Sequence, residues 1–248
     1  METKLLSDHA EDLLKAAELL RNGAVVGMPT ETVYGLAADA RNPEAVRQIF
    51  AAKGRPADNP LIVHIAEMRA LEQVAATVPP LAEKLAERFW PGPLTMILPK
   101  RKEIPEITSG GLDTVGIRMP SHPVARALIQ LSGVPIAAPS ANISGYPSPT
   151  TAQHVMRDMQ GKIAAVVDGG ACSVGVESTV IALEPNGTVR ILRPGFVTKE
   201  MLEEVAPEVT LDPAILHQLQ EGQTVRSPGM KYQHYLSLIH ISEPTRPY

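Results

Sequence analysis

Apolar residues recur along this chain with two different spacings, and the spacing predicts where helices and strands lie. Leu13, Ala17 and Leu20 repeat every three or four positions, which indicates one apolar face of a helix over residues 8–22. Short apolar runs bounded by Gly, Pro or Asn, such as 24–28, indicate buried strands. On these criteria we predict helices at 8–22, 43–53, 67–75, 81–89, 123–131, 151–159 and 199–205. The predicted strands are 24–28, 61–65, 94–98, 114–119, 134–138, 163–167, 178–183 and 189–192.

The predicted strands alternate with helices and end in a hairpin. A Pro185-Asn186-Gly187 turn joins the last two strands. Interleaved strands and helices that finish in a hairpin predict an α/β fold with a mixed β-sheet. After residue 206 the pattern weakens, and 207–226 reads as a linker with one short helix at 213–220. We therefore expect one domain over residues 1–206.

Composition places the chain among ordinary globular proteins, with 44% hydrophobic and 20% charged residues. The net charge of −4 argues against a general polyanion-binding surface. Cys172 is the single cysteine, which excludes an intramolecular disulfide and fits a cytosolic protein. No apolar run reaches the roughly 18 residues of a membrane helix, and the acidic N-terminus does not resemble a signal peptide. We expect a cytoplasmic protein with no membrane association.

Polar residues gather in six clusters at the ends of predicted strands. The first, 29–36 (PTETVYGL), places Thr30, Glu31, Thr32 and Tyr34 directly after the strand 24–28. Ligands of α/β proteins collect outside strand ends, so this loop is a candidate wall of a binding site. A loop that only caps a neighbouring element is the alternative.

The next two clusters carry cations. In 53–60 (KGRPADNP), Lys53 offers a point charge and Arg55 a planar fork for phosphate oxygens; a solvated basic loop is the alternative. This segment leads into the strand that holds His64, a residue type that on a strand is more often core than catalyst. Arg118 ends the cluster 110–118, and an arginine in an apolar strand needs a fixed anionic partner. A protein carboxylate and a substrate carboxylate both remain open.

The last three clusters are 137–150, 175–179 and 193–195. The first two of these are rich in small residues and hydroxyls, and the third begins with Arg193. Small side chains let a phosphate or a flat ligand approach the backbone. Together the six clusters predict one polar pocket with several positive charges, suited to a small anion such as a nucleotide. Phosphate-loop and dinucleotide motifs, structural-zinc spacing and an assignable catalytic triad are absent from the sequence.

In this order, PTETVYGL, KGRPADNPLIVHI, WPGPLT, VGIRMPSHP, PIAAPSANISGYPSPT, GVESTVI and ILRPG resemble motifs of the YrdC-type threonylcarbamoyl-AMP synthase family, over about residues 20–196. The resemblance implies a twisted mixed sheet flanked by helices, with a large concave cleft. It implies a nucleotidyltransferase that converts L-threonine, bicarbonate and ATP into threonylcarbamoyl-AMP and pyrophosphate. Mg²⁺ would enter with ATP and bridge its phosphates, with few protein ligands. The product would pass to a tRNA-modifying threonylcarbamoyltransferase complex, which places threonylcarbamoyladenosine (t6A) beside the anticodon.

The family pattern, carried over residue by residue, assigns the candidate site. The residues implied at threonine are Thr32, His64, Arg118, the backbone of Ala138, and Ser178. Those implied at ATP are Arg55, Asn59, Thr114, Ser140, Asn142, Ser148 and Arg193. Lys53 and Arg55 would act in catalysis at the phosphates, and Arg118 would hold the threonine carboxylate.

Two further segments follow the predicted domain. Residues 227–235 (SPGMKYQHY) resemble the linker that, in longer family members, caps the site and leads to an accessory domain. We therefore expect 207–235 to be a linker and cap, with Tyr232 or Tyr235 at the nucleotide. Residues 236–248 (LSLIHISEPTRPY) resemble a translated sequencing adapter, so we expect a non-native tail in place of that domain. A divergent natural tail is the alternative.

Two rival functions share this fold. A non-catalytic RNA-binding domain would favour a basic groove with aromatic platforms, whereas the net charge is −4 and aromatic residues make up 4% of the chain. RNA binding is therefore expected to be weak. A carbamoyl-adenylate domain of hydrogenase maturation belongs to longer chains with zinc-finger-like cysteines, and the single cysteine argues against it.

Overall fold

The computed structural model describes residues 2–215 of the chain. Within that range the strands form one eleven-stranded sheet in the order β1-β8-β2-β3-β7-β4-β6-β5-β9-β10-β11. Five neighbouring pairs, such as β4 with β6, are parallel. The other five, such as β9 with β10, are antiparallel. The predicted mixed α/β sheet, including the C-terminal hairpin, is confirmed.

The elements have the following bounds. The strands are β1 (Lys4–Leu6), β2 (Val26–Met28), β3 (Gly35–Asp39), β4 (Ile62–His64), β5 (Leu94–Pro99), β6 (Thr114–Arg118), β7 (Ile136–Ala137), β8 (Ala165–Val167), β9 (Thr179–Leu183), β10 (Val189–Arg193) and β11 (Val209–Leu211). The helices are α1 (Ala10–Arg21), α2 (Pro43–Lys53), α3 (Pro80–Phe89), α4 (Glu106–Ser109), α5 (Pro123–Ser132), α6 (Ala152–Met159) and α7 (Lys199–Glu203), with 3₁₀ turns η1 (Met68–Gln73) and η2 (Pro213–Ile215).

Helix α2 shows how local sequence signals set an element that later positions the site. The Asn42 side chain accepts hydrogen bonds from the backbone N–H groups of Glu44 and Ala45, which closes the first turn. Gly54 ends the helix in the left-handed conformation, at φ 66°. The chain therefore turns sharply between Lys53, the last helical residue, and Arg55.

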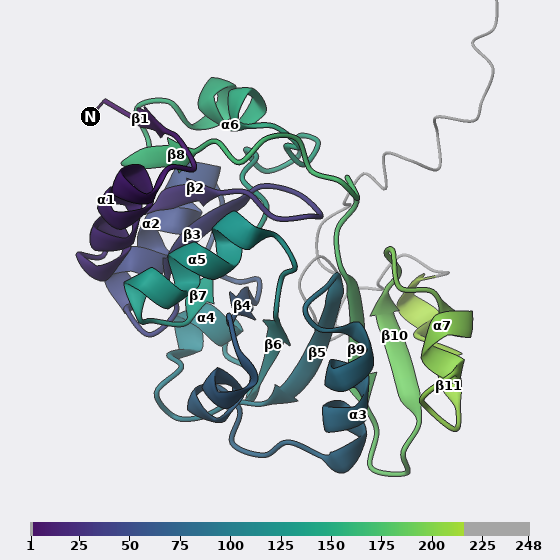
Figure 1. Cartoon of the computed structure of the whole chain (residues 1–248). Helices are drawn as coiled ribbons and strands as arrows, with labels where there is room; N and C mark the ends of the chain where they lie inside the picture. The colour runs from purple at the N-terminus through teal and green to yellow at the C-terminus, as the bar shows by residue number, and fades with distance from the viewer. Residues whose placement is uncertain (1, 216–248) are drawn as a thin grey trace, which may run out of the picture.

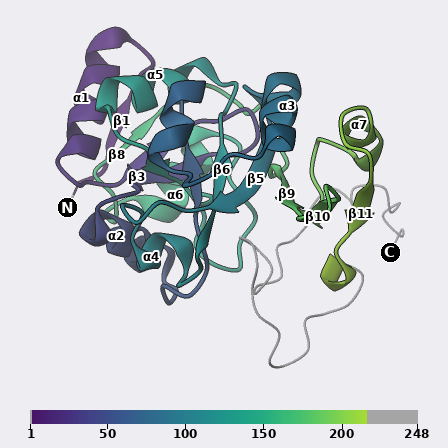
Figure 2. The ribbon, with the colours of Figure 1, turned by 90° about the horizontal axis from the view of Figure 1, so that it is seen from below.

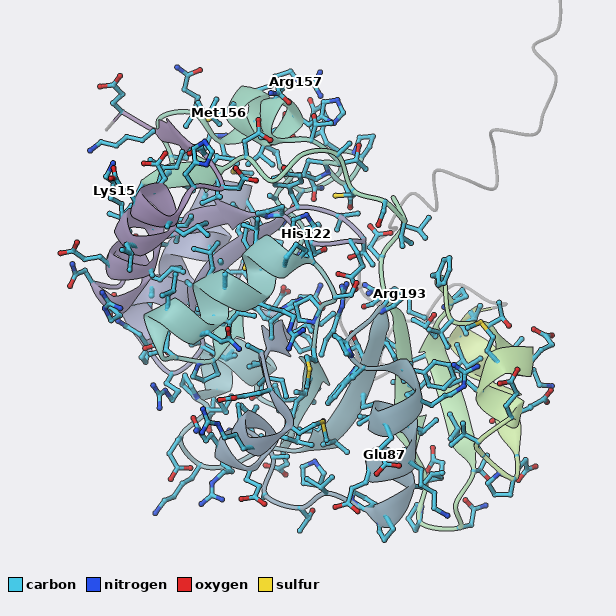
Figure 3. The ribbon with its side chains drawn as sticks, in the orientation of Figure 1. Lys15, Glu87, His122, Met156, Arg157 and Arg193 are labelled. Carbon is cyan, nitrogen blue, oxygen red and sulfur yellow. The ribbon has the colours of Figure 1, made fainter. Side chains whose placement is uncertain are left out.

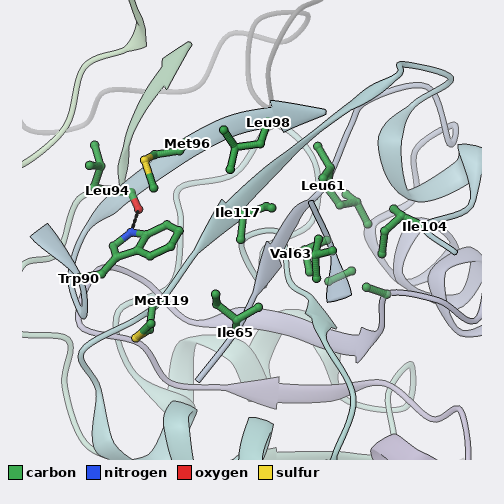
Figure 4. Close-up of a cluster of buried hydrophobic side chains, with 14 of the residues drawn as sticks. Leu61, Val63, Ile65, Trp90, Leu94, Met96, Leu98, Ile104, Ile117 and Met119 are labelled. Atoms are coloured by element: carbon green, nitrogen blue, oxygen red, sulfur yellow. Dashed lines mark hydrogen bonds between the residues drawn. The ribbon is translucent and has the colours of Figure 1, made fainter. Parts of the chain in front are cut away.

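Helices cover both faces of the sheet (Figures 1 and 2). Helices α1 and α5 lie side by side on one face, where Leu13, Leu20 and Leu128 belong to one buried cluster. Helices α2 and α4 lie on the opposite face. Figure 4 shows the larger cluster around β4, β5 and β6, in which the Trp90 indole N–H donates to the carbonyl of Leu94 at 2.7 Å. The site residues thus stand on a rigid, well-packed sheet.

The sequence pattern missed four elements, β1, β3, α4 and β11. β3 reads Gly-Leu-Ala-Ala-Asp, and residues of this kind have low strand propensity, so its pairing with β2 and β7 determines its conformation. β11 lies inside the expected linker, and it extends the sheet because Val209 pairs in parallel register with Val189. The predicted helix 67–75 is the 3₁₀ turn η1. Residues 216–235, the rest of the expected linker and cap, and the tail 236–248 lie outside the described residues.

No helix in residues 2–215 is both long enough and apolar enough to cross a membrane.

Candidate active site

A cavity that is partly open to solvent lies among the strand ends. All six polar clusters of the sequence contribute to its wall, each through at least one side chain. Representative lining residues are Thr32, Arg55, Arg118, Ser140, Ser178 and Arg193. The predicted convergence of the clusters on one pocket is therefore confirmed.

The five residues expected at threonine all line this cavity: Thr32, His64, Arg118, Ala138 and Ser178. Their proximity follows from the sheet. In the parallel pair β4 and β6, His64 stands opposite Arg118. Ala138 directly follows β7, which pairs with β4 on its other side. Three adjacent strands thus present these groups at one place.

Arg118 is buried and held by three acceptors. Its Nη2 donates to Glu31 Oε1 at 2.6 Å, Nη1 donates to Thr32 Oγ1 at 2.9 Å, and Nε donates to the Gly92 carbonyl at 3.2 Å. The anionic partner left open by the sequence is therefore the Glu31 carboxylate. A guanidinium has five N–H groups, so two of those of Arg118 remain for a ligand in the cavity.

His64 lies beside this pair as a neutral imidazole. Burial, reinforced by the positive charge of Arg118, lowers its pKa to about 3. Among the described residues, its Nδ1 atom has no hydrogen-bond partner. A neutral ring with an unused nitrogen in a cavity wall can accept a hydrogen bond from a bound ligand, or donate one to it, without adding charge.

Arg193 holds the start of β9 from the end of β10 (Figure 3). Its Nε and Nη2 donate to the Ser178 carbonyl at 3.1 and 2.9 Å, and Nη2 also donates to Ser178 Oγ at 3.1 Å. Burial lowers the pKa of Arg193 to about 10, against the opposing effect of Glu177, so the guanidinium stays charged at neutral pH. Gly195 packs directly on this backbone, because a Cβ there would lie 2.5 Å from both Glu177 O and Thr179 N.

Four of the residues expected at ATP also line the cavity: Arg55, Asn59, Ser140 and Arg193. The Oδ1 atom of Asn59 is buried and has no hydrogen-bond partner within residues 2–215. Three arginines and one glutamate, Glu177, are the ionised groups in the wall, since His64 is neutral. The cavity therefore carries a net positive charge inside a protein whose overall charge is −4.

Four other expected residues do not line the cavity. Thr114 begins β6 and Arg118 ends it, so the two stand about 13 Å apart at the strand rise of 3.3 Å per residue. Ser148 donates to Glu177 Oε1 at 2.6 Å. Asn142 holds its own loop, with Nδ2 donating to the carbonyls of Ile143 at 2.9 Å and Tyr146 at 2.6 Å. Tyr232 and Tyr235 lie outside the described residues.

Lys53 is the fourth expected residue that does not line the cavity, and its side chain is buried. Its ammonium donates to the carbonyl of Ser140, to the carbonyl of Asn142 at 2.8 Å and to Asn142 Oδ1 at 3.4 Å. Burial, together with the positive charge of Arg55, holds the pKa of Lys53 well below its usual value. In this structure Lys53 anchors the loop that carries Ser140, whereas Arg55, two residues later, reaches the cavity.

Sequence reasoning missed Glu177 as a lining residue. The motif GVEST drew attention through its hydroxyls, and the signal that could have found Glu177 is the lone carboxylate beside them. Cys172 is half-buried and burial raises the pKa of its thiol to about 11, so it is protonated at neutral pH. Residues 2–215 contain no group of three or more His, Cys, Asp or Glu side chains that could hold a metal ion.

Comparison with known proteins gives the site a family context. A family model described as "Telomere recombination" (Sua5_yciO_yrdC) matches residues 18–195. The threonylcarbamoyl-AMP synthase of Pyrococcus abyssi is 54% identical over 220 residues, which cover 89% of this chain and 64% of that protein. The threonylcarbamoyl-AMP synthase of Bacillus subtilis is 52% identical, over 94% of this chain and 66% of that protein. The chain thus spans about two thirds of the length of these relatives.

The solved structures agree with the sequence comparison. The crystal structure of P. abyssi Sua5 complexed with L-threonine superimposes with a TM-score of 0.89 at 50% sequence identity, and the match covers 95% of this chain and 69% of that chain. The expectation of a YrdC-like fold is confirmed. The matching family model covers most of the chain, and all six polar clusters lie inside it, so the chain belongs to the Sua5/YciO/YrdC family.

Proposed function

We propose that this protein is an L-threonylcarbamoyladenylate synthase, a nucleotidyltransferase that uses L-threonine, bicarbonate and ATP. One observation carries the proposal: a single cavity holds both a carboxylate-binding group, Arg118, and a separate set of cations, Arg55 and Arg193. An amino acid and a nucleotide can therefore bind side by side. The relatives named threonylcarbamoyl-AMP synthase and the threonine-bound P. abyssi structure support this assignment.

The reaction divides into two balanced steps. The threonine amine combines with bicarbonate to give a carbamate and water. A carbamate oxygen then attacks the α-phosphorus of ATP, the bond to the β-phosphate oxygen breaks, and pyrophosphate leaves. No covalent bond to the protein is needed, so the work of the site is to position the reactants and to offset negative charge.

The residues of the cavity suit these two tasks. Arg118 has two N–H groups for the threonine carboxylate, and Thr32, already bonded to it, fixes its direction. Arg55 and Arg193 line the same space, and their charges would offset those of the phosphates and of the departing pyrophosphate. Lys53 supports this arrangement from behind by fixing the loop at Ser140.

We propose that Mg²⁺ would be held mainly by the ATP and would offset the negative charge of its phosphates, because Mg²⁺ takes few protein ligands at nucleotide sites. Glu177 is the single carboxylate in the described wall of the cavity. We expect the reaction to run in the cytoplasm, where the single thiol stays reduced, and the product to be used by a tRNA-modifying threonylcarbamoyltransferase complex.

The experiment that tests this function is pyrophosphate release from ATP, with threonine and bicarbonate each omitted in turn. We expect release to depend on both. A rate that is unchanged without threonine would reject the synthase. A protein that releases no pyrophosphate but retains single-stranded RNA in a filter-binding assay would support the rival, non-catalytic function.

A further inference from the structure

The buried hydroxyl of Thr95 has a single hydrogen-bond partner in the described structure. Thr95 lies in β5, its side chain is 0% exposed, and its Oγ1 atom lies 2.7 Å from Ser178 Oγ. The parallel pairing of β5 with β9, with Leu94 opposite Thr179, brings the two hydroxyls together. Either oxygen could be the donor on geometry alone.

The count of protons and acceptors decides the direction of this bond. Leaving a buried hydroxyl proton without an acceptor costs free energy. Within residues 2–215 Ser178 Oγ is the one acceptor within reach of Thr95, so Thr95 donates and Ser178 accepts. Arg193 Nη2 donates to the same Ser178 oxygen at 3.1 Å. A serine hydroxyl has two acceptor sites and one proton, so both acceptor sites are filled.

The proton of Ser178 is then left to point into the cavity that this residue lines. A ligand atom beside it must be a hydrogen-bond acceptor. Arg118 and Arg193 line the same space, and a negatively charged oxygen satisfies all three groups at once, whereas an ammonium would be repelled.

We propose that Thr95 is a positioning residue: it fixes the Ser178 hydroxyl as a hydrogen-bond donor to a carboxylate oxygen of the amino-acid substrate. The proposal rests on the proposed function and assigns a role to a residue that does not itself line the cavity. Without the Thr95 hydroxyl, Ser178 has a free acceptor site and its proton is no longer directed at the substrate.

The test is a double-mutant cycle of Thr95→Val and Ser178→Ala, read out as threonine affinity by calorimetry and as KM for threonine and for ATP. Valine keeps the shape of threonine and removes the hydroxyl. We expect Thr95→Val to weaken threonine binding about five- to tenfold, with little change in the KM for ATP. In the Ser178→Ala background the same change should have no further effect. Thr95→Ser, which keeps the hydroxyl, should bind threonine as the wild type does.

The matched control is Thr108→Val. Thr108 is also 0% exposed and its hydroxyl makes one hydrogen bond, to the Ala40 carbonyl, outside the cavity. Removal of the Thr108 hydroxyl should leave threonine affinity unchanged. If Thr95→Val does not fold, comparison of Thr95→Ser with Thr95→Ala gives the same information.

Three results would overturn the inference. Wild-type threonine affinity in Thr95→Val would show that the hydroxyl does not matter. An equal loss in the Ser178→Ala background would show that Thr95 acts only on the fold. A wild-type protein that binds no threonine would remove the proposed function and this inference together, which distinguishes that failure from the first two.

Discussion

The buried pair of Arg118 and Glu31 allows a test of the proposed threonine site. Their side chains are 4% and 6% exposed, and 2.6 Å separates Nη2 from Oε1. The second oxygen of Glu31 has no hydrogen-bond partner in the described residues. Arg118→Ala therefore leaves a buried carboxylate without a counter-charge, and breaking a buried pair in this way costs about 3–5 kcal/mol of stability.

A second substitution separates stability from binding. Glu31→Gln added to Arg118→Ala replaces the stranded charge by a neutral amide, whose burial costs less, so about 2 kcal/mol of unfolding free energy should return. Threonine binding should not return, because the carboxylate still lacks its cation. A contact between arginine and a carboxylate contributes about 2–3 kcal/mol, so we expect a loss of about 30- to 150-fold in threonine affinity in both variants.

Urea unfolding measures the first effect and calorimetry with threonine and with an ATP analogue measures the second. ATP affinity should change little, since Arg55 and Arg193 remain in place. If the double variant binds threonine like the wild type, Arg118 does not hold the substrate carboxylate. If the double variant is no more stable than Arg118→Ala, the stranded Glu31 charge is not the cause of the instability.

Three further predictions follow from neighbouring contacts. Lys53→Met should lower both the melting temperature and turnover, because the Ser140 and Asn142 carbonyls lose their donor; an unchanged melting temperature would contradict the anchoring role. Gly195→Ala should cost about 1–3 kcal/mol and weaken threonine binding, since its Cβ would press on Glu177 O at 2.5 Å; wild-type stability and binding would refute this. The pKa of His64 is lowered from 6.5 to about 3, so an unfolded chain takes up a proton below pH 6.5 that the folded chain refuses. The stability that the neutral imidazole contributes is therefore fully present above pH 6.5 and is lost as the pH falls towards 3. His64→Gln should reduce the slope of unfolding free energy against pH, between pH 6 and 4, by up to about 1.4 kcal/mol per pH unit. An unchanged slope would contradict the buried neutral imidazole.

Elements with strong local signals were predictable from the sequence. Asn42, Pro43 and Gly54 mark both ends of α2, and the predicted range 43–53 agrees with the structure. β3 and β11 carry no comparable signal, because their conformation depends on neighbouring strands that are distant in sequence. A local sequence pattern does not show which distant strand a segment will pair with.

The candidate site shows the same division. The sequence identified the six clusters, and all of them reach the cavity. It did not show which side chain in a cluster faces the ligand. The left-handed turn at Gly54 sends Lys53 into the core and Arg55 into the cavity, although both are cations two positions apart. Thr114 and Arg118 share one strand, yet the strand's length separates them.

Glu31 illustrates what the third dimension adds. In the sequence it is one of four polar residues in the segment 29–36. It pairs with Arg118 because the β2–β3 loop packs against the end of β6. Only the folded structure shows which carboxylate Arg118 pairs with. That partner is Glu31, and two N–H groups of Arg118 remain for a substrate carboxylate.

The most direct test of the central claim, that one cavity joins an amino acid to a nucleotide through a carbonyl group, is mass spectrometry of the product formed with isotopically labelled bicarbonate. We expect a nucleotide product that contains AMP, threonine and the labelled carbon, formed together with pyrophosphate. AMP or ADP released without the label, at the same rate with and without threonine, would contradict it.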